Sequence, residues 1–151
     1  MLLLEPLMRR MTFAFAALAL VACSDGSGPD AREQFAGIWD LVSVDGQAVP
    51  VELAAGPPAR VELLSIELDF TSPTLPGVET RSFRSTPTAG GAPSLVGGMT
   101  EVSFEVEDDQ VTIINTGSGL PDDVGTLDDD TLTISRSVLG VYRVHVYQKR
   151  P

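Results

Sequence analysis

The sequence predicts an all-β domain, a small antiparallel up-and-down barrel of about eight strands, preceded by a helical segment at the N-terminus. Two patterns carry this prediction: apolar and polar residues alternate with a period of two, and turn-forming residues separate the alternating segments. After Cys23 no stretch sustains a helical period, and the nearest candidate, residues 51–55, is stopped by Gly56-Pro57-Pro58. Strands spaced this closely favour a barrel over a sandwich.

The alternation is clearest in two segments, residues 64–71 and residues 101–107. A strand with one apolar and one polar face is typical of an antiparallel sheet that covers a core on one side. We therefore expect the apolar members of both segments to point into the barrel, namely Leu64, Ile66, Leu68, Phe70, Val102, Phe104 and Val106.

Aspartate-rich turns connect the later strands. Asp108-Asp109-Gln110 precedes a strand at residues 111–115, and Asp128-Asp129-Asp130 precedes another at residues 131–135. The final strand, residues 141–149, has two different faces, and we expect the inward face to be the one with Tyr142, Val144 and Val146.

Residues 72–100 are rich in Gly and Pro. They contain at most one weak strand, residues 79–85, with Phe83 pointing inward. The sequence therefore predicts that this segment is the mobile edge of the sheet.

Composition excludes several classes of function. The chain of 151 residues has 21 acidic and 10 basic side chains, and its net charge of −11 argues against nucleic-acid binding. One Cys and one His argue against a zinc site, and His145 stands in a strand without a second His or a serine-nucleophile motif. We expect no enzyme activity, no cofactor and no nucleotide site.

Clusters of Asp leave one metal alternative open. Pairs or triplets of Asp occur at residues 108–109, 122–123 and 128–130, and hard cations such as calcium bind several oxygens. These clusters lack the spacing of a calcium loop, however, and Asp forms turns through hydrogen bonds to its own backbone. We assign them to turns and expect no metal.

The N-terminus has the pattern of a helical signal peptide. Arg9 and Arg10 precede an apolar run, residues 12–22, that is too short to span a membrane. The run ends Leu20-Val21-Ala22-Cys23, which resembles the bacterial lipobox. The resemblance implies that Cys23 carries a diacylglyceryl group with fatty acyl chains such as palmitate, and that it is the first mature residue. The alternative is an ordinary signal peptide with a chance Cys or a buried free thiol.

This reading divides the chain into three parts. Residues 1–22 are the lipoprotein signal peptide, residues 23–34 are the lipidated Cys and a flexible tether, and residues 35–151 are the barrel domain. Ser24 follows the Cys, and by resemblance to bacterial lipoprotein sorting it favours the outer membrane, facing the periplasm. The lipid anchor would be the contact with the membrane, because the acidic domain is repelled by an anionic leaflet.

The start of the domain resembles lipocalin-like domains of bacterial lipoproteins. Such domains begin with Gly-x-Trp, here Gly37-Ile38-Trp39, and turn at Asp-Gly, here Asp45-Gly46. The similarity extends over residues 35–150 and is most specific at the two ends. It implies a lipocalin-like barrel in which Trp39 plugs the closed end and packs under an Arg of the last strand, Arg150 or Arg143.

Two functions remain in view. The first is a non-catalytic, lipid-anchored binding module of the cell envelope that holds a small apolar ligand inside a hollow barrel. The ligand would touch Leu64, Ile66, Leu68, Phe70, Val102, Phe104, Val106, Tyr142, Val144 and Val146. The alternative is a solid-core module that meets another envelope protein through its acidic outer face or through residues 72–100. In both cases we expect a monomer.

Overall fold

The computed structural model describes residues 31–72, 76–116, 119 and 121–151. The expected signal peptide, Cys23 and most of the expected tether lie outside these residues. The described residues form one short helix and ten strands: α1 (Ala31–Phe35), β1 (Gly37–Val44), β2 (Gln47–Ala48), β3 (Val51–Ala54), β4 (Ala59–Phe70), β5 (Gly77–Pro87), β6 (Ser94–Glu107), β7 (Gln110–Ile114), β8 (Asp123–Asp128), β9 (Thr131–Val138) and β10 (Val141–Lys149).

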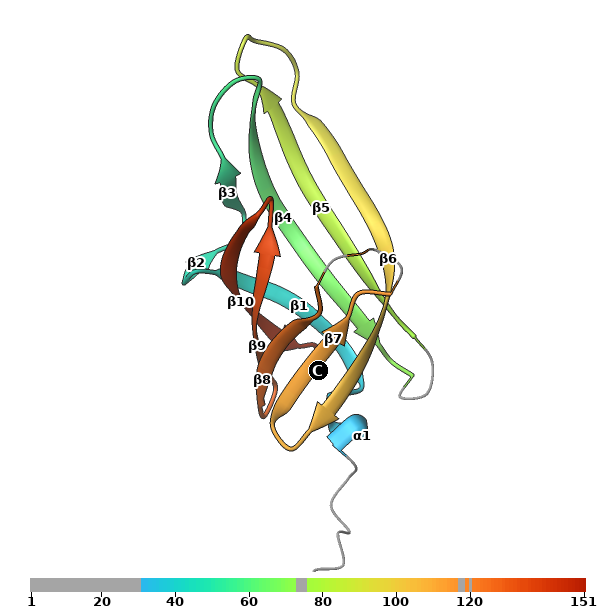
Figure 1. Cartoon of the computed structure of the whole chain (residues 1–151). Coiled ribbons are helices and arrows are strands. Elements are labelled where there is room, and N and C mark those ends of the chain that lie inside the picture. Colours follow the sequence, from blue (N-terminus) through green and yellow to red (C-terminus); the bar gives the residue numbers. More distant parts are fainter. Residues whose placement is uncertain (1–30, 73–75, 117–118, 120) are drawn as a thin grey trace, which may run out of the picture.

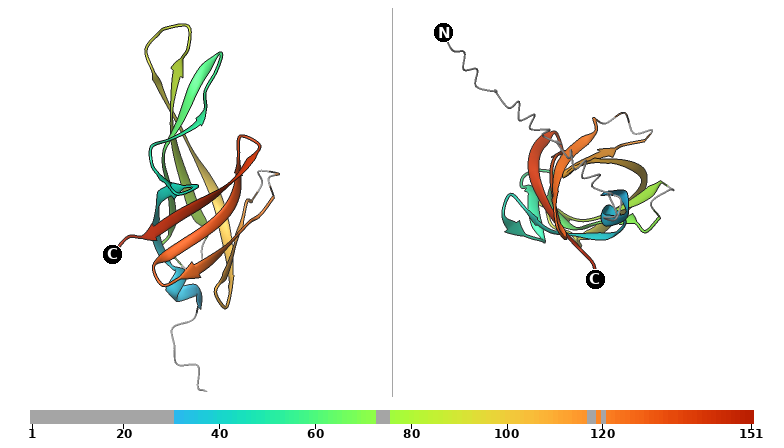
Figure 2. Two further views of the ribbon diagram at one scale, coloured as in Figure 1. Left: turned by 90° about the vertical axis from the view of Figure 1, so that its left-hand side faces the viewer. Right: turned by 90° about the horizontal axis from the view of Figure 1, so that it is seen from below.

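The strands form a closed eight-stranded antiparallel barrel (Figures 1 and 2). From β4 to β10 each strand pairs with the next along the chain. Closure comes from β1, which pairs with β10 along one edge and with β4 along the other. Trp39 is central to the closure, because it lies opposite Lys149 on one side and opposite Leu68 on the other. The predicted all-β barrel is confirmed.

Helix α1 replaces the last part of the expected tether. Residues 31–35 read Ala-Arg-Glu-Gln-Phe, and the first four are good helix formers. Phe35 is fully buried and fixes the short helix to the barrel. Seen from below, α1 sits across one end of the barrel (Figure 2, right). The tether prediction was therefore wrong for residues 31–34, because a buried anchor at the end of the segment orders it.

Three strands extend past the barrel at the end opposite α1 (Figure 1). We call this extension, with β3 along its side, the tower; it comprises residues 51–66 and 80–101. The prediction of at most one weak strand in residues 72–100 was wrong, because β5 and much of β6 lie there. Continuous pairing of β5 with β4 and β6 outweighs the poor strand composition, and the Gly-Pro run falls in the turn between them.

Four aromatic rings plug the barrel next to α1. Phe35 stacks on Trp39 with ring centroids 5.3 Å apart, and it also contacts Phe70 at 5.0 Å and Phe104 at 4.6 Å. The indole Nε1–H of Trp39 donates a hydrogen bond of 2.9 Å to the Phe35 carbonyl, so its polar atom is satisfied in the core. Apolar rings packed at these distances leave this end of the barrel solid.

The cation beside Trp39 is Lys149, and the prediction of Arg150 or Arg143 was wrong. Lys149 Nζ lies 5.6 Å from the ring centroid, because Lys149 is the residue paired with Trp39 and points to the same side. Arg150 is one residue further and points outward, where its guanidinium binds Asp40 at 2.6 Å and Glu67 at 2.7 Å. Arg143 stands near the other end of β10 and binds Asp45 at 3.2 Å.

Trp39→Ala should lower the free energy of unfolding by about 3–5 kcal/mol, because it removes a fully buried ring from a packed cluster. Urea denaturation measures this loss, and the exposed Val42→Ala on the same strand is the control, with an expected loss below about 1 kcal/mol. Trp39 is the single Trp of the chain, so its fluorescence also reports burial. A solvent-like emission maximum in the wild type would contradict the plug.

Candidate functional site

The barrel interior beyond the aromatic plug holds a buried ionic cluster. Arg136 on β9 lies between two carboxylates, with Nη2 at 2.9 Å from Glu79 Oε2 on β5 and 2.7 Å from Asp123 Oδ2 on β8. Arg81 on β5 contacts the second oxygen of Glu79 through its Nε. The two positive and two negative charges balance, as burial of ionic groups requires.

Two residues of β10 extend the cluster. The Tyr147 hydroxyl accepts a hydrogen bond of 3.1 Å from Arg136 Nη1, and it lies 3.5 Å from His145 Nδ1. His145 Nε2 is buried and has no hydrogen-bond partner among the described residues. Burial, together with the positive charges of Arg136 and Arg81, lowers the pKa of His145 to about 4. The imidazole is therefore neutral at neutral pH. Burial also raises the pKa of Tyr147, which stays protonated.

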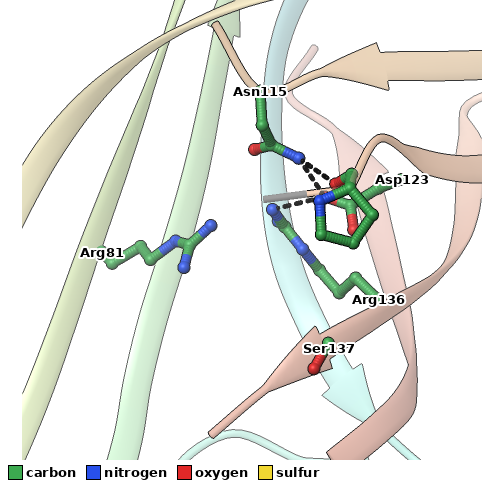
Figure 3. A pocket seen from close by; sticks show the side chains of 6 residues that line it. Arg81, Asn115, Asp123, Arg136 and Ser137 are labelled. Atoms are coloured by element: carbon green, nitrogen blue, oxygen red, sulfur yellow. Dashed lines mark hydrogen bonds and ion pairs between the residues drawn. The ribbon is translucent and has the colours of Figure 1, made fainter. Parts of the chain in front are cut away.

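A small polar cavity borders this cluster (Figure 3). Arg81 reaches toward it from one side, and Asn115, Asp123 and Arg136 approach from the other. The Asn115 side-chain amide donates to the Pro121 carbonyl at 2.8 Å and to Asp123 at 3.3 Å, which holds the cavity wall in place. The cavity volume is about 20 Å³, which is close to the space that one water molecule needs.

Most of the expected ligand-lining residues pack against one another instead of facing a cavity. Ile66, Leu68 and Phe70 on β4 and Val102 and Phe104 on β6 are buried in one hydrophobic cluster. Val106 is partly buried and packs on the same cluster. These side chains therefore form the core of the barrel, in contact with the aromatic plug.

Leu64 is not a core residue, because β4 has a bulge at this position. The pairing with β5 shifts between Leu63 and Ser65, so Leu63 takes the fully buried place and Leu64 is half-buried. A bulge adds one residue and reverses the alternation on its N-terminal side. Strict alternation counted back from Ile66 predicts Leu64 as the inward residue. The bulge moves the inward position to Leu63, so this prediction was wrong.

The expected inward face of β10 is also wrong. Tyr142 and Val144 are 67% and 44% exposed and Val146 is half-buried on the outer face, whereas His145 and Tyr147 are completely buried. The register explains this, since His145 pairs with the buried Ile134 and Tyr147 with the buried Leu132. Both faces of β10 carry apolar side chains, so alternation alone does not show which face is buried. The hydrogen bond from Arg136 to the Tyr147 hydroxyl favours burial of the face with His145 and Tyr147.

The acidic turns have two different roles. Asp108 and Asp129 have φ angles of 56° and 50°, the left-handed conformation that Asp tolerates in tight turns. Asp123, which we assigned to a turn, is instead a buried strand residue that binds Arg136. Within the described part of the chain, no group of three or more His, Cys, Asp or Glu side chains is placed to hold a metal ion.

The sequence reasoning missed the ionic cluster, although one signal for it was present. Phe83 was expected to point inward, and a strand alternates with a period of two, so Glu79 and Arg81 had to share that face. The pattern alone does not place Glu79 and Arg81 inside the barrel, because charged side chains are rarely buried unless they have partners of opposite charge. The partners Asp123 and Arg136 lie 44 and 57 residues after Glu79 in the chain, on β8 and β9.

No protein-family model matches the chain, and no curated protein matches it. Among the residues that the structure describes, none of the helices is long and apolar enough to cross a membrane.

His145 should make stability depend on pH. Its pKa is about 4 in the folded state and 6.5 when unfolded, so between these values the unfolded chain binds a proton that the folded chain does not. Stability therefore falls as the pH drops, by about 2 kcal/mol from pH 8 to pH 5. Urea denaturation at the two pH values should show a smaller fall for His145→Gln. An equal fall in both proteins would contradict the neutral buried imidazole.

Proposed function

We propose that this chain is a lipid-anchored protein of the bacterial cell envelope, and that its barrel is a solid-core module that binds another protein. The observation that carries the proposal is the filled interior. Aromatic rings plug one end of the barrel, aliphatic side chains and the ionic cluster occupy the interior beyond them, and the cavity beside the cluster measures about 20 Å³. Sites for small molecules usually have about 300 Å³ or more. A larger cavity of about 320 Å³ lies outside the barrel, at the turn between β3 and β4, where Ala54, Pro58 and Val61 are among the residues that line it.

A small apolar ligand fits this interior poorly. To enter the plugged half it would have to displace Phe70 and Phe104, which contact each other at 4.9 Å. To enter the other half it would have to separate Arg136 from Glu79 and Asp123, which would leave charges buried without partners. Either displacement costs several kcal/mol of free energy. This cost is more than a small apolar ligand would regain from its contacts inside the barrel.

The lipid anchor gives the domain an orientation. The anchor rests on the lipobox-like Leu20-Val21-Ala22-Cys23, and eight peptide units join Cys23 to Ala31, at most about 27 Å. Helix α1 lies at the plugged end, so this end would stay close to the membrane. The tower would then point away from the membrane, toward other proteins of the envelope.

The tower offers a surface unlike the rest of the molecule. The chain has a net charge of −11, yet residues 53–59 and 85–100 contain no charged side chain. These two segments meet at the end of the tower, where the Thr88 amide and hydroxyl both donate to the Pro58 carbonyl. Leu95, Val96 and Met99 are exposed here. An exposed apolar surface surrounded by polar ones is typical of a protein-binding site.

Native mass spectrometry of the mature protein, purified from its host in mild detergent, tests the solid core. We expect the mass of the lipidated chain without a bound small molecule, because the interior has no room for one. A stoichiometric apolar molecule that is released on denaturation would overturn the solid-core function and favour the hollow binding module.

Cys23→Ser should abolish lipidation and move the protein out of the membrane fraction, because the variant lacks the thiol that the acyl group needs. Cell fractionation and gel mobility measure the change. Ser27→Ala, four residues further along the same segment, is the matched control and should leave the protein in the membrane fraction. Unchanged partitioning and mobility of Cys23→Ser would contradict the anchor.

A further inference from the structure

The N-terminal half of β6 has a free edge. Residues Ser94–Glu101 pair with β5 on one side, whereas β7 pairs with β6 only from Ser103 onward. Among the described residues no strand pairs with the other side of this half. In Figure 1 this part of β6 is the uncovered margin of the tower. Alternate N–H and C=O groups along it are therefore open for pairing.

This edge lacks the features by which proteins protect an edge strand. Such edges usually carry Lys, Pro, a bulge or an inward charge. Residues 94–100 read Ser-Leu-Val-Gly-Gly-Met-Thr, without a charge or a Pro, and pair with β5 without a register shift. Leu95 and Met99 are 76% and 74% exposed, and the two glycines between them add no side chain that would keep another strand away.

The acidic residues around the free edge of β6 favour a partner that carries basic residues. The edge itself is neutral, but its barrel end carries the exposed Glu101 and Glu105, and the whole chain has a net charge of −11. A partner with basic residues is attracted to this field, and a basic residue at one end of its strand would meet Glu101.

We propose that the free edge of β6 binds an extended segment of another protein as an added β-strand, and that this segment is apolar at alternate positions and basic at its end. Main-chain hydrogen bonds to Ser94–Glu101 hold the segment, and its apolar side chains cover Leu95 and Met99. This inference rests on the proposed function and adds the place, the mode and the chemistry of the partner.

Two other occupants fit less well. A bilayer cannot satisfy the open N–H and C=O groups of a strand edge, which lipid-exposed proteins avoid. A second copy carries the same charge of −11 and is repelled. The edge of eight residues is also only about 27 Å long, too short to bury the roughly 1,200 Å² of a stable dimer.

A synthetic peptide tests the inference with the mature, detergent-solubilised protein. The probe is fluorescein-labelled Lys-Thr-Val-Thr-Val-Thr-Val-Lys, which places a Lys beside Glu101 in either strand direction. We expect fluorescence anisotropy to show saturable binding below about 1 mM, weakened about tenfold by Leu95→Lys and by Met99→Lys. Leu139→Lys, in the turn before β10, is the matched control: Leu139 is 66% exposed, and its change should leave binding unchanged.

Two altered probes separate main-chain pairing from simple apolar contact. A peptide with the same side chains and N-methyl groups on the alternate residues whose N–H groups would face β6 should not bind, because it lacks the donors that pair with this edge. A peptide with Glu in place of both Lys should bind about tenfold more weakly, and added salt should reduce the difference. Equal binding of the methylated and unmethylated peptides would overturn the strand addition, as would the absence of binding at about 1 mM.

The remaining outcomes identify a different occupant. A dimer in sedimentation experiments that Leu95→Lys dissociates would show that a second copy binds the edge. Binding to phosphatidylcholine vesicles that is lost in Leu95→Lys would show that a lipid surface does. Both results overturn this inference and leave the solid core untouched, since only a co-purified apolar molecule would overturn that.

Discussion

Arg136 is the residue on which the interior of this barrel depends. Its guanidinium binds Glu79 from β5, Asp123 from β8 and Tyr147 from β10, so one side chain connects β9 with both of its neighbouring strands and with β5 across the barrel. Removing Glu79 or Asp123 would leave an unbalanced positive charge buried in a medium that solvates it poorly. The charges are therefore matched to one arrangement of the strands, and a shift of register by one residue would turn the partners to the outside.

The plugged end uses a different physical principle. Phe35 enters the barrel from α1 and stacks on Trp39, and Lys149 covers the indole from the last strand. This packing is apolar and tolerates small changes of shape, whereas the ionic cluster depends on direction and distance. Aromatic packing and the ionic cluster leave a cavity of only about 20 Å³ in the described interior, and this is why we propose that a partner binds the outer surface. The tower is the part of that surface where neutral side chains and an open strand edge coincide.

A feature of the fold could be predicted from the sequence only when residues close together in the chain determine it. The alternation at Ile66, Leu68 and Phe70 comes from one strand with one dry face, so it was visible in the sequence. The bulge at Leu63 and the choice of face on β10 were not visible, because each depends on a neighbouring strand. Lys149 faces Trp39 for the same reason, since the pairing of β1 with β10 decides which cation reaches the ring.

The sequence by itself determined the all-β class, the antiparallel order of strands and the positions of most turns, because alternation and turn chemistry act over a few residues. Only the tertiary structure decided what fills the barrel. Glu79, Asp123 and Arg136 are each unfavourable inside a protein, and their burial is possible only when strands far apart in the chain bring opposite charges within hydrogen-bonding distance. That condition involves three strands at once, and no local pattern of residues contains it.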